Sequence, residues 1–386
     1  MNDSVFYTAH GTNNQYFATV ARGLEAIAAD ELTELGAKQV KAGFCGVEFT
    51  GDLGLLYYVN LWARLPFRIL VKLHQFPCGN AQELYHGIKS IDWSAYLNPS
   101  LTLSVNATGK SEFLNHTHFT ALQVKNAIVD QQLADFGERS NVDPKDADLQ
   151  IGVHIADDIC TVSLDSSGNS LHRRGYRAAV GAAPLKESLA AALIRLSGWE
   201  PEQVFYDPLC GSGTLPLEAS LKALNIAPGL FRERFGFESW LDCDQMLLDK
   251  LMAEAEGSQK QNLPAAIWGS DHNDAVIAQA TANARKCGVA NHVHFEILEL
   301  SEVEPPATTG VLFCNPPYGE RLGQNTDLRE FYRELGNVLK QRFKGWTAFI
   351  LSGNKELSQC IGLKSAQRTA VYNGTLPCQL MKYELY

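Results

Sequence analysis

The sequence predicts an α/β fold with a parallel sheet in its C-terminal half, preceded by a smaller α+β region. Three observations support this fold class. A chain of 386 residues is too long for one ordinary core, so two or three domains are expected. From about residue 185, short apolar runs alternate with helical patterns, as in a parallel sheet covered by helices. Before that point, strands of alternating polar and apolar residues predominate.

The elements of the N-terminal region follow one another closely. Residues 1 to about 14 are polar and predict a mobile tail. Leu24, Ala28 and Leu32 recur at helical spacing, which predicts an amphipathic helix within residues 21–37. Glycines and alternation then predict a β-α-β-β opening that continues into a further helix and strand. The strands are expected at 16–22, 38–43, 45–52 and 68–76, and the second helix at 53–66.

A second group of elements is predicted between residues 73 and 165. Alternation predicts strands at 101–109, 151–158 and 159–168, around a helix at 117–136. The result is a small α+β region distinct from the α/β part that follows.

The α/β part contains five short apolar runs that predict parallel strands. Helical patterns at 274–288 and 327–343 lie between runs, and the final segments 368–374 and 378–385 predict an antiparallel hairpin that closes the sheet. The five runs lie at 204–206, 266–270, 293–297, 310–314 and 347–352.

Bulk composition indicates a globular cytoplasmic protein. Hydrophobic residues make up 45% and charged residues 20% of the chain, as is usual for soluble domains. No apolar run approaches the ~20 residues of a membrane-spanning helix, and the N-terminus does not have the pattern of a secretory signal. The nine cysteines form no C-x-x-C pair and the His116/His118 pair lacks further ligands, so no metal is expected.

The net charge of −10 does not by itself favour a nucleic-acid partner, because such proteins gain affinity from lysine and arginine contacts to phosphate. The distribution of charge matters more. Arg173, Arg174 and Arg177 fall within five residues of one another, and such a basic strip on an acidic body is compatible with selective RNA contact.

The first motif with a chemical meaning is a glycine-rich turn between a strand and a helix. It reads VFYDPLCGSGTLPLEASL and includes Asp207 and Gly211-Ser212-Gly213-Thr214. Glycines let the backbone approach a ligand, and the helix N-terminus offers amide groups to a polar or anionic group. A nucleotide-like ligand is therefore expected. The G-x-G-x-x-G fingerprint fails at Pro216 and no P-loop lysine follows, which disfavours NAD and ATP.

The next acidic residue of interest is Asp271, directly after the second apolar run. A carboxylate at the end of this strand can accept hydrogen bonds from ribose hydroxyls. An insert of about residues 225–262 separates the two strands, so Asp271 lies further along than in a simple dinucleotide-binding unit. The alternative interpretation is that Asp271 caps the following helix.

The second motif is Asn315-Pro316-Pro317-Tyr318, which follows the strand GVLFC. Two prolines fix the backbone and remove two donors. An aromatic amine is a poor nucleophile, and acceptors at the Asn315 side chain and the Pro316 carbonyl would orient its lone pair toward an incoming methyl. Tyr318 could stack on the base. The alternative is an ordinary proline-rich turn.

From about Phe17 to its end, the chain resembles class I S-adenosylmethionine-dependent methyltransferases, and in particular bacterial 23S rRNA guanine-N2 methyltransferases with a THUMP domain. The most specific stretches are ATVARGLE, SLHRRGYRAAVGAAPLKESLAAALI, DPLCGSGTLPLEA, GSDHND and FCNPPYGERL. The resemblance implies a ferredoxin-like region at 1–72, a THUMP RNA-binding domain at 73–166 and a Rossmann-like seven-stranded methyltransferase domain at 167–386.

The resemblance also implies roles for individual residues. The donor, S-adenosylmethionine, would contact the glycine turn through its methionine part, Asp271 through its ribose, and Glu299, where the family usually has Asp, through its adenine. Asn315, Pro316, Pro317 and Tyr318 would form the target-base pocket, and Arg173, Arg174, Arg177 and Lys186 would contact RNA or join domains through salt bridges. The full set of implied donor residues is Asp207, Cys210, Gly211, Ser212, Gly213, Thr214, Asp271, His272, Glu299 and Asn315.

The expected activity is methyl transfer to N2 of a guanine in large-subunit rRNA or its precursor particle. The same motif serves tRNA guanine-N2, adenine-N6 and protein-glutamine methyltransferases, and a non-catalytic RNA-binding assembly factor or a dehydrogenase are the rivals from other classes. The sequence leaves open which nucleotide is modified and which oligomeric state the protein adopts.

Overall fold

The computed structural model describes residues 11, 13–177, 185–318 and 328–386. Most of the predicted N-terminal tail, residues 178–184 of the arginine-rich stretch, and Gly319 lie outside this range. The chain forms two compact units. Unit 1 contains residues up to Val20, Ala28–Leu171 and Arg232–Ala253, and unit 2 contains Ala21–Ile27, His172–Phe231 and Glu254–Tyr386.

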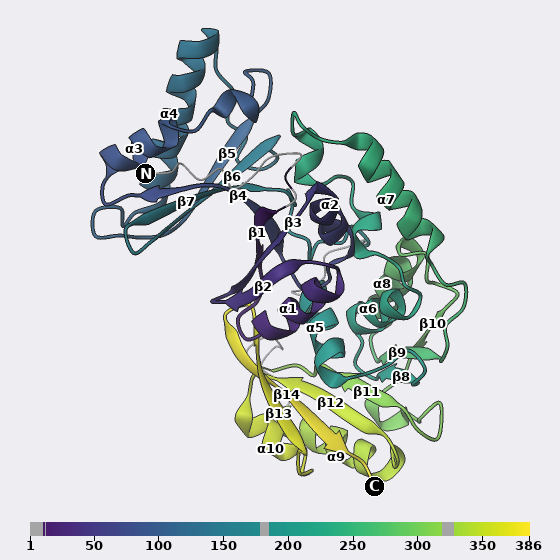
Figure 1. The fold of residues 1–386 in the computed structure, drawn as a ribbon. Helices are drawn as coiled ribbons and strands as arrows, with labels where there is room; N and C mark the ends of the chain where they lie inside the picture. The colour runs from purple at the N-terminus through teal and green to yellow at the C-terminus, as the bar shows by residue number, and fades with distance from the viewer. Residues whose placement is uncertain (1–10, 12, 178–184, 319–327) are drawn as a thin grey trace. The chain divides into compact units, whose positions relative to one another are not determined.

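Unit 1 is built on one seven-stranded sheet with the order β2-β3-β1-β4-β7-β6-β5 (Figure 1). All neighbouring strands are antiparallel except the β5–β6 pair. The strands are β1 (Asn14–Thr19), β2 (Lys38–Gly43), β3 (Gly46–Gly51), β4 (Arg68–Pro77), β5 (Leu103–Gly109), β6 (Leu149–Ala156) and β7 (Ile159–Asp165). The helices of this part of the chain are α1 (Glu25–Glu34), α2 (Leu53–Trp62), α3 (Ala81–Lys89), η1 (Trp93–Ala95) and α4 (Thr117–Phe136).

Strand β4 makes the sheet of unit 1 continuous. It pairs with β1 along one edge, over Arg68–Val71, and with β7 along the other, over Leu70–Pro77. The predicted β-α-β-β opening and the second α+β region therefore share one sheet instead of forming two separate ones.

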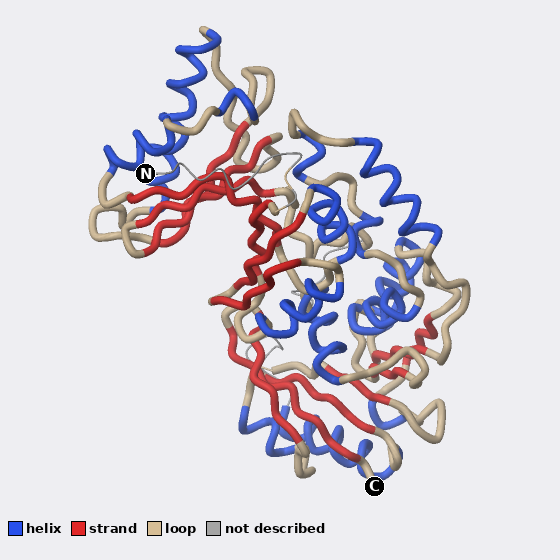
Figure 2. Tube along the Cα trace, in the orientation of Figure 1, coloured by secondary structure: helices blue, strands red, loops and turns tan. Residues whose placement is uncertain are grey.

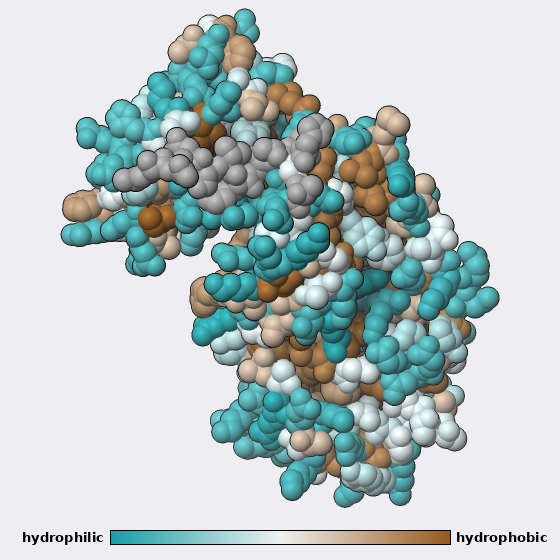
Figure 3. Space-filling view, in the orientation of Figure 1, coloured by the Kyte–Doolittle hydropathy of each residue, from teal (hydrophilic) through white to brown (hydrophobic). Residues whose placement is uncertain are grey.

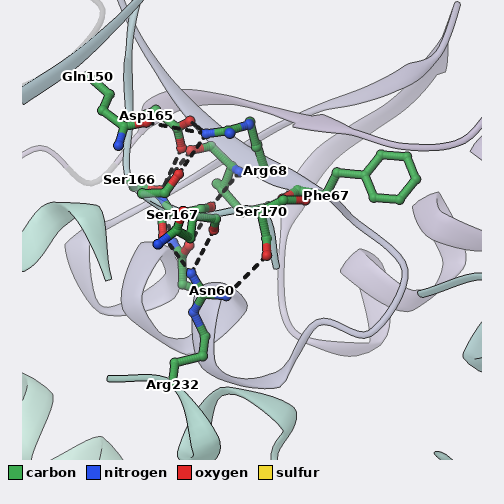
Figure 4. Close-up of polar contacts among 12 residues, drawn as sticks. Asn60, Phe67, Arg68, Gln150, Asp165, Ser166, Ser167, Ser170 and Arg232 are labelled. Carbon is green, nitrogen blue, oxygen red and sulfur yellow. Dashed lines mark hydrogen bonds and ion pairs between the residues drawn. The ribbon is translucent and has the colours of Figure 1, made fainter. Parts of the chain in front are cut away.

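A cluster of hydrogen-bonded polar side chains lies at the end of β7 in unit 1 (Figure 4). The Arg68 guanidinium forms an ion pair with Asp165 and donates to the Gly168 carbonyl at 2.7 Å. Burial raises the pKa of Asp165, and Arg68 opposes that rise. The Ser167 hydroxyl donates to the Asn60 side chain at 2.8 Å. The buried Asp165 carboxylate and the buried Asn60 side chain thus both have partners, which removes most of the cost of burying them.

Residues 232–253 depart from the expected domain division. They lie in the expected 167–386 domain, yet they group with unit 1. Arg232 Nη2 donates to the carbonyls of Ser167 and Asn169 at 2.9 and 2.6 Å. Phe237 stacks on Tyr57, with ring centroids 4.0 Å apart. The insert seen in the sequence is therefore partly a component of the N-terminal unit.

Unit 2 is built on a second seven-stranded sheet, with the order β10-β9-β8-β11-β12-β14-β13. Strands β8 to β12 run parallel to one another, whereas β14 runs antiparallel to both β12 and β13, as the predicted closing hairpin requires. The strands are β8 (Phe205–Asp207), β9 (Ile267–Asp271), β10 (Val293–Ile297), β11 (Val311–Cys314), β12 (Thr347–Ser352), β13 (Gln367–Asn373) and β14 (Leu376–Glu384).

Helices cover both faces of this sheet (Figure 2). Helices α5, α6 and α8 lie on one face and α9 and α10 on the other (Figure 1). Across the middle of the sheet, Phe313 stacks on Phe205 and Phe349 with centroid separations of 4.9 and 5.3 Å. The helices are α5 (Glu187–Ser197), α6 (Thr214–Ala223), α8 (Asp274–Lys286), α9 (Leu328–Arg342) and α10 (Lys355–Cys360), with the short η2 (Pro228–Phe231) and η4 (Leu300–Glu302). The insert adds η3 (Gly236–Ser239) and α7 (Gln245–Gly257).

Hydrophilic residues cover most of the face drawn in Figure 3. Within the described ranges, the helices are all too short or too polar to cross a bilayer. The same ranges contain no group of three or more His, Cys, Asp or Glu side chains arranged to hold a metal.

Candidate cofactor and substrate site

Three polar residues meet at one edge of the sheet in unit 2. Asp207 ends β8, Asp271 ends β9, and Asn315 directly follows β11. Strand β8 lies between the other two and is parallel to both, with Asp207 opposite Gly269 and Leu312 opposite Tyr206. Neighbouring parallel strands are about 4.8 Å apart. The structure therefore brings the two sequence motifs and Asp271 to the same carboxyl edge, where α/β sheets bind ligands.

The glycine turn leaves space for a ligand at the start of α6. Gly211 and Gly213 have φ of +52° and +83°, a region that favours glycine. A Cβ at Gly211 would meet no atom within 4 Å, so this side of the turn is open, whereas a Cβ at Gly213 would lie 3.0 Å from the Phe295 ring. Among the described residues, no side chain caps α6 at Gly213. The amides at its N-terminus remain available to a polar group of a ligand.

Asp271 joins the end of β9 to the glycine turn. Its Oδ2 accepts from the Gly211 amide at 3.1 Å and its Oδ1 accepts from the Asn273 amide at 3.0 Å. The cap of α8 is Asn273, whose side chain accepts from the Ala275 amide at 2.9 Å. The helix-cap alternative thus applies to Asn273. His272 is mostly exposed, with Nδ1 3.4 Å from Asp271 Oδ1.

Asp207 is a buried carboxyl at the centre of the edge. It accepts from the Leu209 amide at 3.0 Å. Burial, with a smaller contribution from Asp271, raises the pKa of Asp207 to about 8. Cys210 is also buried, and burial raises the pKa of its thiol. A cationic ligand beside Asp207 would favour the ionised carboxylate.

The end of β10 adds an apolar residue that the sequence pattern did not reveal. Ile297 lies opposite Asp271 in the β9–β10 register and is 57% exposed. In the segment VHFEI it looks like an ordinary core residue of a strand. Glu299 is exposed two residues later, at the start of η4, where its amide donates to Glu302 Oε2 at 3.2 Å. Ile297 and Glu299 thus offer an apolar surface and a carboxylate beside Asp271.

The Asn315 side chain presents an unsatisfied acceptor. Its Oδ1 is buried and has no hydrogen-bond partner among the described residues. Leaving a buried acceptor unpaired costs about 1–3 kcal/mol, so a ligand donor is expected to meet it. Pro316 is buried, and the Pro317 carbonyl accepts from the Tyr332 hydroxyl at 3.3 Å. The turn is therefore fixed while one of its acceptors stays open.

Tyr318 is held by the β13–β14 hairpin. Its hydroxyl accepts from Asn373 Nδ2 at 3.0 Å and lies 3.8 Å from Cys378 Sγ. A Cβ at Gly353 would lie 3.0 Å from Tyr318 Cδ2, so the ring lies close to that backbone. Burial raises the pKa of Tyr318. Sequence reasoning missed Asn373, because nothing in its local pattern indicates a partner 55 residues away.

The structure corrects the RNA-contact prediction for Arg174. This side chain is buried, with 1% exposure, and its Nε lies 3.5 Å from Glu218 Oε1. The Tyr176 hydroxyl donates to the same oxygen at 3.1 Å. Arg174 therefore neutralises a buried carboxylate of α6, and no RNA can reach it. Arg173 and Lys186 are exposed, as the prediction requires of them.

Arg177 also departs from the prediction. Its Nε is 2.5 Å from Glu187 Oε1, and its Nη2 donates to Thr214 Oγ1 at 3.2 Å. Its Nη1 donates to Ser212 Oγ at 3.5 Å. The guanidinium faces the glycine turn instead of solvent. The ion pairs of Arg174 with Glu218 and of Arg177 with Glu187 both lie within unit 2.

Burial and nearby cationic side chains lower the pKa of His172. Its pKa falls to about 4, first because of burial and then because of Lys186, Arg174 and Arg173. His172 is therefore neutral at pH 7, and the positive potential around it comes from the arginines and the lysine.

The site residues fit S-adenosylmethionine. The glycine turn and the α6 N-terminus could hold its methionine part, Asp271 has lone pairs for ribose hydroxyls, and Ile297 offers a surface for adenine. The buried carboxyl of Asp207 suits a ligand that carries positive charge.

Three family models match the chain in sequence. Residues 15–70 match the RlmL ferredoxin-like domain, residues 78–165 the THUMP domain, and residues 174–382 the RMKL-like methyltransferase domain.

Individual relatives agree with these matches. The protein slr0064 of Synechocystis sp., named a putative RNA methyltransferase, is 55% identical over the full length of both chains. The ribosomal RNA large subunit methyltransferase K/L of a Shewanella species is 40% identical over 96% of this chain and 53% of its own, so the chain spans about half the length of that relative. A crystal structure of SMU.472, described as a putative methyltransferase complexed with SAH, has a TM-score of 0.87 and 31% identity, over 97% of this chain and 99% of its own.

Proposed function

The chain belongs to the RMKL-like methyltransferase family, and from this premise we propose that it methylates the exocyclic N2 amine of a guanine in 23S rRNA. The methyl donor is S-adenosylmethionine, and the protein is an RNA methyltransferase. The guanine target, its N2 position and the roles of individual residues are the proposal.

The unpaired Asn315 Oδ1 is the observation that carries this proposal. An exocyclic amine has two N–H donors and a lone pair delocalised into its ring. Asn315 Oδ1 accepts one N–H and the Pro316 carbonyl accepts the other, which turns the lone pair toward the methyl group. S-adenosylmethionine supplies that methyl on a sulfonium, which makes it electrophilic. The amine nitrogen forms its bond to the methyl carbon as the bond between that carbon and sulfur breaks, and S-adenosylhomocysteine is released. The methylated ammonium then loses a proton to solvent or to an acceptor in the pocket, and this transfer requires no metal.

Different residues along the sheet edge bind different parts of the donor. Asp207, Cys210 and the turn at Gly211–Thr214 enclose its methionine part. Asp271 accepts from the ribose, with His272 beside it. Ile297 and Glu299 contact the adenine.

The RNA-binding part of the proposal concerns the N-terminal regions and the exposed cations. We assign residues 1–72 to a ferredoxin-like region, 73–166 to a THUMP RNA-binding domain and 167–386 to the methyltransferase domain, with the reassignment of 232–253 described above. Arg173 and Lys186 contact phosphates. A paired target guanine must leave its stack to reach Asn315, at a cost of a few kcal/mol, and Tyr318 then stacks on it.

The first test replaces Asn315 with Ala. We expect turnover to fall by about 100- to 1,000-fold, the cost of removing one preorganised acceptor, while the affinity for S-adenosylhomocysteine stays within about twofold. Methylation of rRNA transcripts and calorimetry measure the two quantities. Asn291→Ala, which changes an exposed asparagine outside the site, is the matched control. An Asn315→Ala enzyme with wild-type turnover would show that this side chain does not hold the amine.

The second test identifies the product. Mass analysis of nucleosides after incubation of the protein with rRNA is expected to show N2-methylguanosine. The appearance of N6-methyladenosine, or of modified tRNA alone, would replace the guanine assignment with one of the alternatives that share the motif.

A further inference from the structure

We propose that Arg177 is a positioning residue of the donor turn, which fixes the side chains of Ser212 and Thr214 and takes no part in RNA contact. The inference rests on the proposed function only in assuming that the glycine turn binds the methyl donor.

The geometry of the guanidinium supports this role. Arg177 uses both edges of its planar group. One nitrogen binds Glu187, another donates to the Leu185 carbonyl at 2.7 Å and to Thr214, and the third donates to Ser212. Only arginine presents donors in such a fork. Its side chain is 17% exposed, so little of it is left for an RNA phosphate.

The turn is held from a second side as well. Asn283 of α8 donates to the Ser212 carbonyl at 3.0 Å. Arg177 binds the side chains of the turn, whereas Asn283 binds its backbone. The segment around Arg177 is itself fixed to α6, because Arg174 and Tyr176 both contact Glu218, one turn of helix beyond Thr214. Arg177 thus contacts the turn from a fixed position.

The restraint matters because of the two glycines in the turn. Gly211 and Gly213 both adopt positive φ, and glycine loses more conformational freedom on ordering than any other residue. A turn that is ordered before the donor arrives binds it more tightly. Because Arg177 does not touch the reacting atoms, its loss should raise the donor KM and leave kcat nearly unchanged.

The test compares Arg177→Gln with Arg173→Gln, a matched change at an exposed arginine of the same stretch. For Arg177→Gln we expect about tenfold weaker binding of S-adenosylhomocysteine by calorimetry, the loss of charge-assisted hydrogen bonds, and unchanged affinity for an rRNA transcript. Arg177→Lys should fall between wild type and Arg177→Gln. Arg173→Gln should leave S-adenosylhomocysteine affinity unchanged. Weaker RNA binding with normal S-adenosylhomocysteine binding in Arg177→Gln would overturn the inference.

A double variant excludes a purely structural explanation. Removing Arg177 leaves Glu187 buried without its partner, which can unfold the local structure. Arg177→Gln combined with Glu187→Gln removes both charges. If Arg177 orders the turn, affinity stays about tenfold weak although the melting temperature recovers. Recovery of affinity would show that Arg177 only neutralises Glu187, which contradicts the proposal. The S-adenosylhomocysteine measurements contain no RNA, so a wrong guanine assignment does not affect them. A wild-type protein that fails to bind S-adenosylhomocysteine would overturn both proposals.

Discussion

At the scale of single residues, the burial of Asp207 makes its ionised carboxylate unfavourable, and a cationic donor beside it would stabilise that carboxylate. Its pKa is raised from 3.8 to about 8, so the folded protein retains a proton that the unfolded chain has already lost. Between these two values the folded state binds more protons than the unfolded state, and stability falls as pH rises. Below pH 4 both states are protonated and the cost disappears.

Asp207→Asn should therefore stabilise the donor-free protein in a pH-dependent way. We expect its advantage in melting temperature over wild type to grow from about pH 4 to about pH 8, reaching on the order of 10 °C for a unit of this size. Its affinity for S-adenosylmethionine should fall several-fold, because the carboxylate that suits a cationic ligand is gone. Thermal scans across pH and calorimetry measure these effects. A difference in melting temperature that does not change with pH would contradict the assignment of the raised pKa.

The sequence could predict the location of those site residues that directly follow a predicted strand. Asp271 and Asn315 come directly after apolar runs, and parallel strands carry such residues to a common edge. Arg174 could not be placed in this way. A run of arginines shows charge, but its partner Glu218 lies 44 positions away on a helix face, and only the packed structure brings the two together.

At the scale of elements, the β13–β14 hairpin has a second role besides closing the sheet. Asn373, the last residue of β13, binds the Tyr318 hydroxyl, and Gly353 after β12 lies close to the Tyr318 ring. The hairpin therefore sets the orientation of the ring that is proposed to stack on the target base.

Asn373→Ala should release that ring. We expect the KM for RNA to rise about three- to tenfold, since one hydrogen bond contributes roughly 0.5–1.5 kcal/mol, with donor affinity unchanged. Tyr318→Phe should have a similar effect, and the double variant should be no worse than either single variant. Gln367→Ala, at an exposed position of the same strand, is the control. Additive losses in the double variant would show that Asn373 does not act through Tyr318.

Sequence patterns predicted most of the elements, but they did not predict helix α3. The segment AQELYHGIK contains a glycine, which lowers the helical propensity of a short segment. Gly87 is needed there because a Cβ would lie 2.1 Å from the Phe76 ring. The packing requirement of the whole unit thus overrides local propensity at this position.

At the scale of the whole molecule, the two units are not consecutive along the chain. Residues 232–253 belong to unit 1, although the residues before and after them in sequence belong to unit 2. Within unit 1, Phe237 is fully buried against Tyr57. The sequence showed this insert only as extra spacing between the glycine turn and Asp271. Its periodicity and charge carry no information about which unit it joins, because partner choice depends on the shape of a distant surface.

Phe237→Ala tests this connection in the full-length protein. We expect unit 1 to lose about 3–5 kcal/mol of stability, the usual cost of removing a buried phenylalanine, measured by urea unfolding. Phe44→Ala, at a residue that is 82% exposed, should change stability by less than about 0.5 kcal/mol. Equal effects of the two substitutions would show that the insert contributes little to the N-terminal unit.

The return of residues 232–253 to unit 1 also affects the order of events during translation. Chains usually fold from the N-terminus as they emerge from the ribosome. Here the N-terminal unit still lacks Arg232 and Phe237 when Leu171 emerges, and its missing segment is made only after α5, β8 and α6. The first unit can therefore be completed only once residue 253 has been synthesised, when Glu254–Tyr386 of the second unit are still to be made.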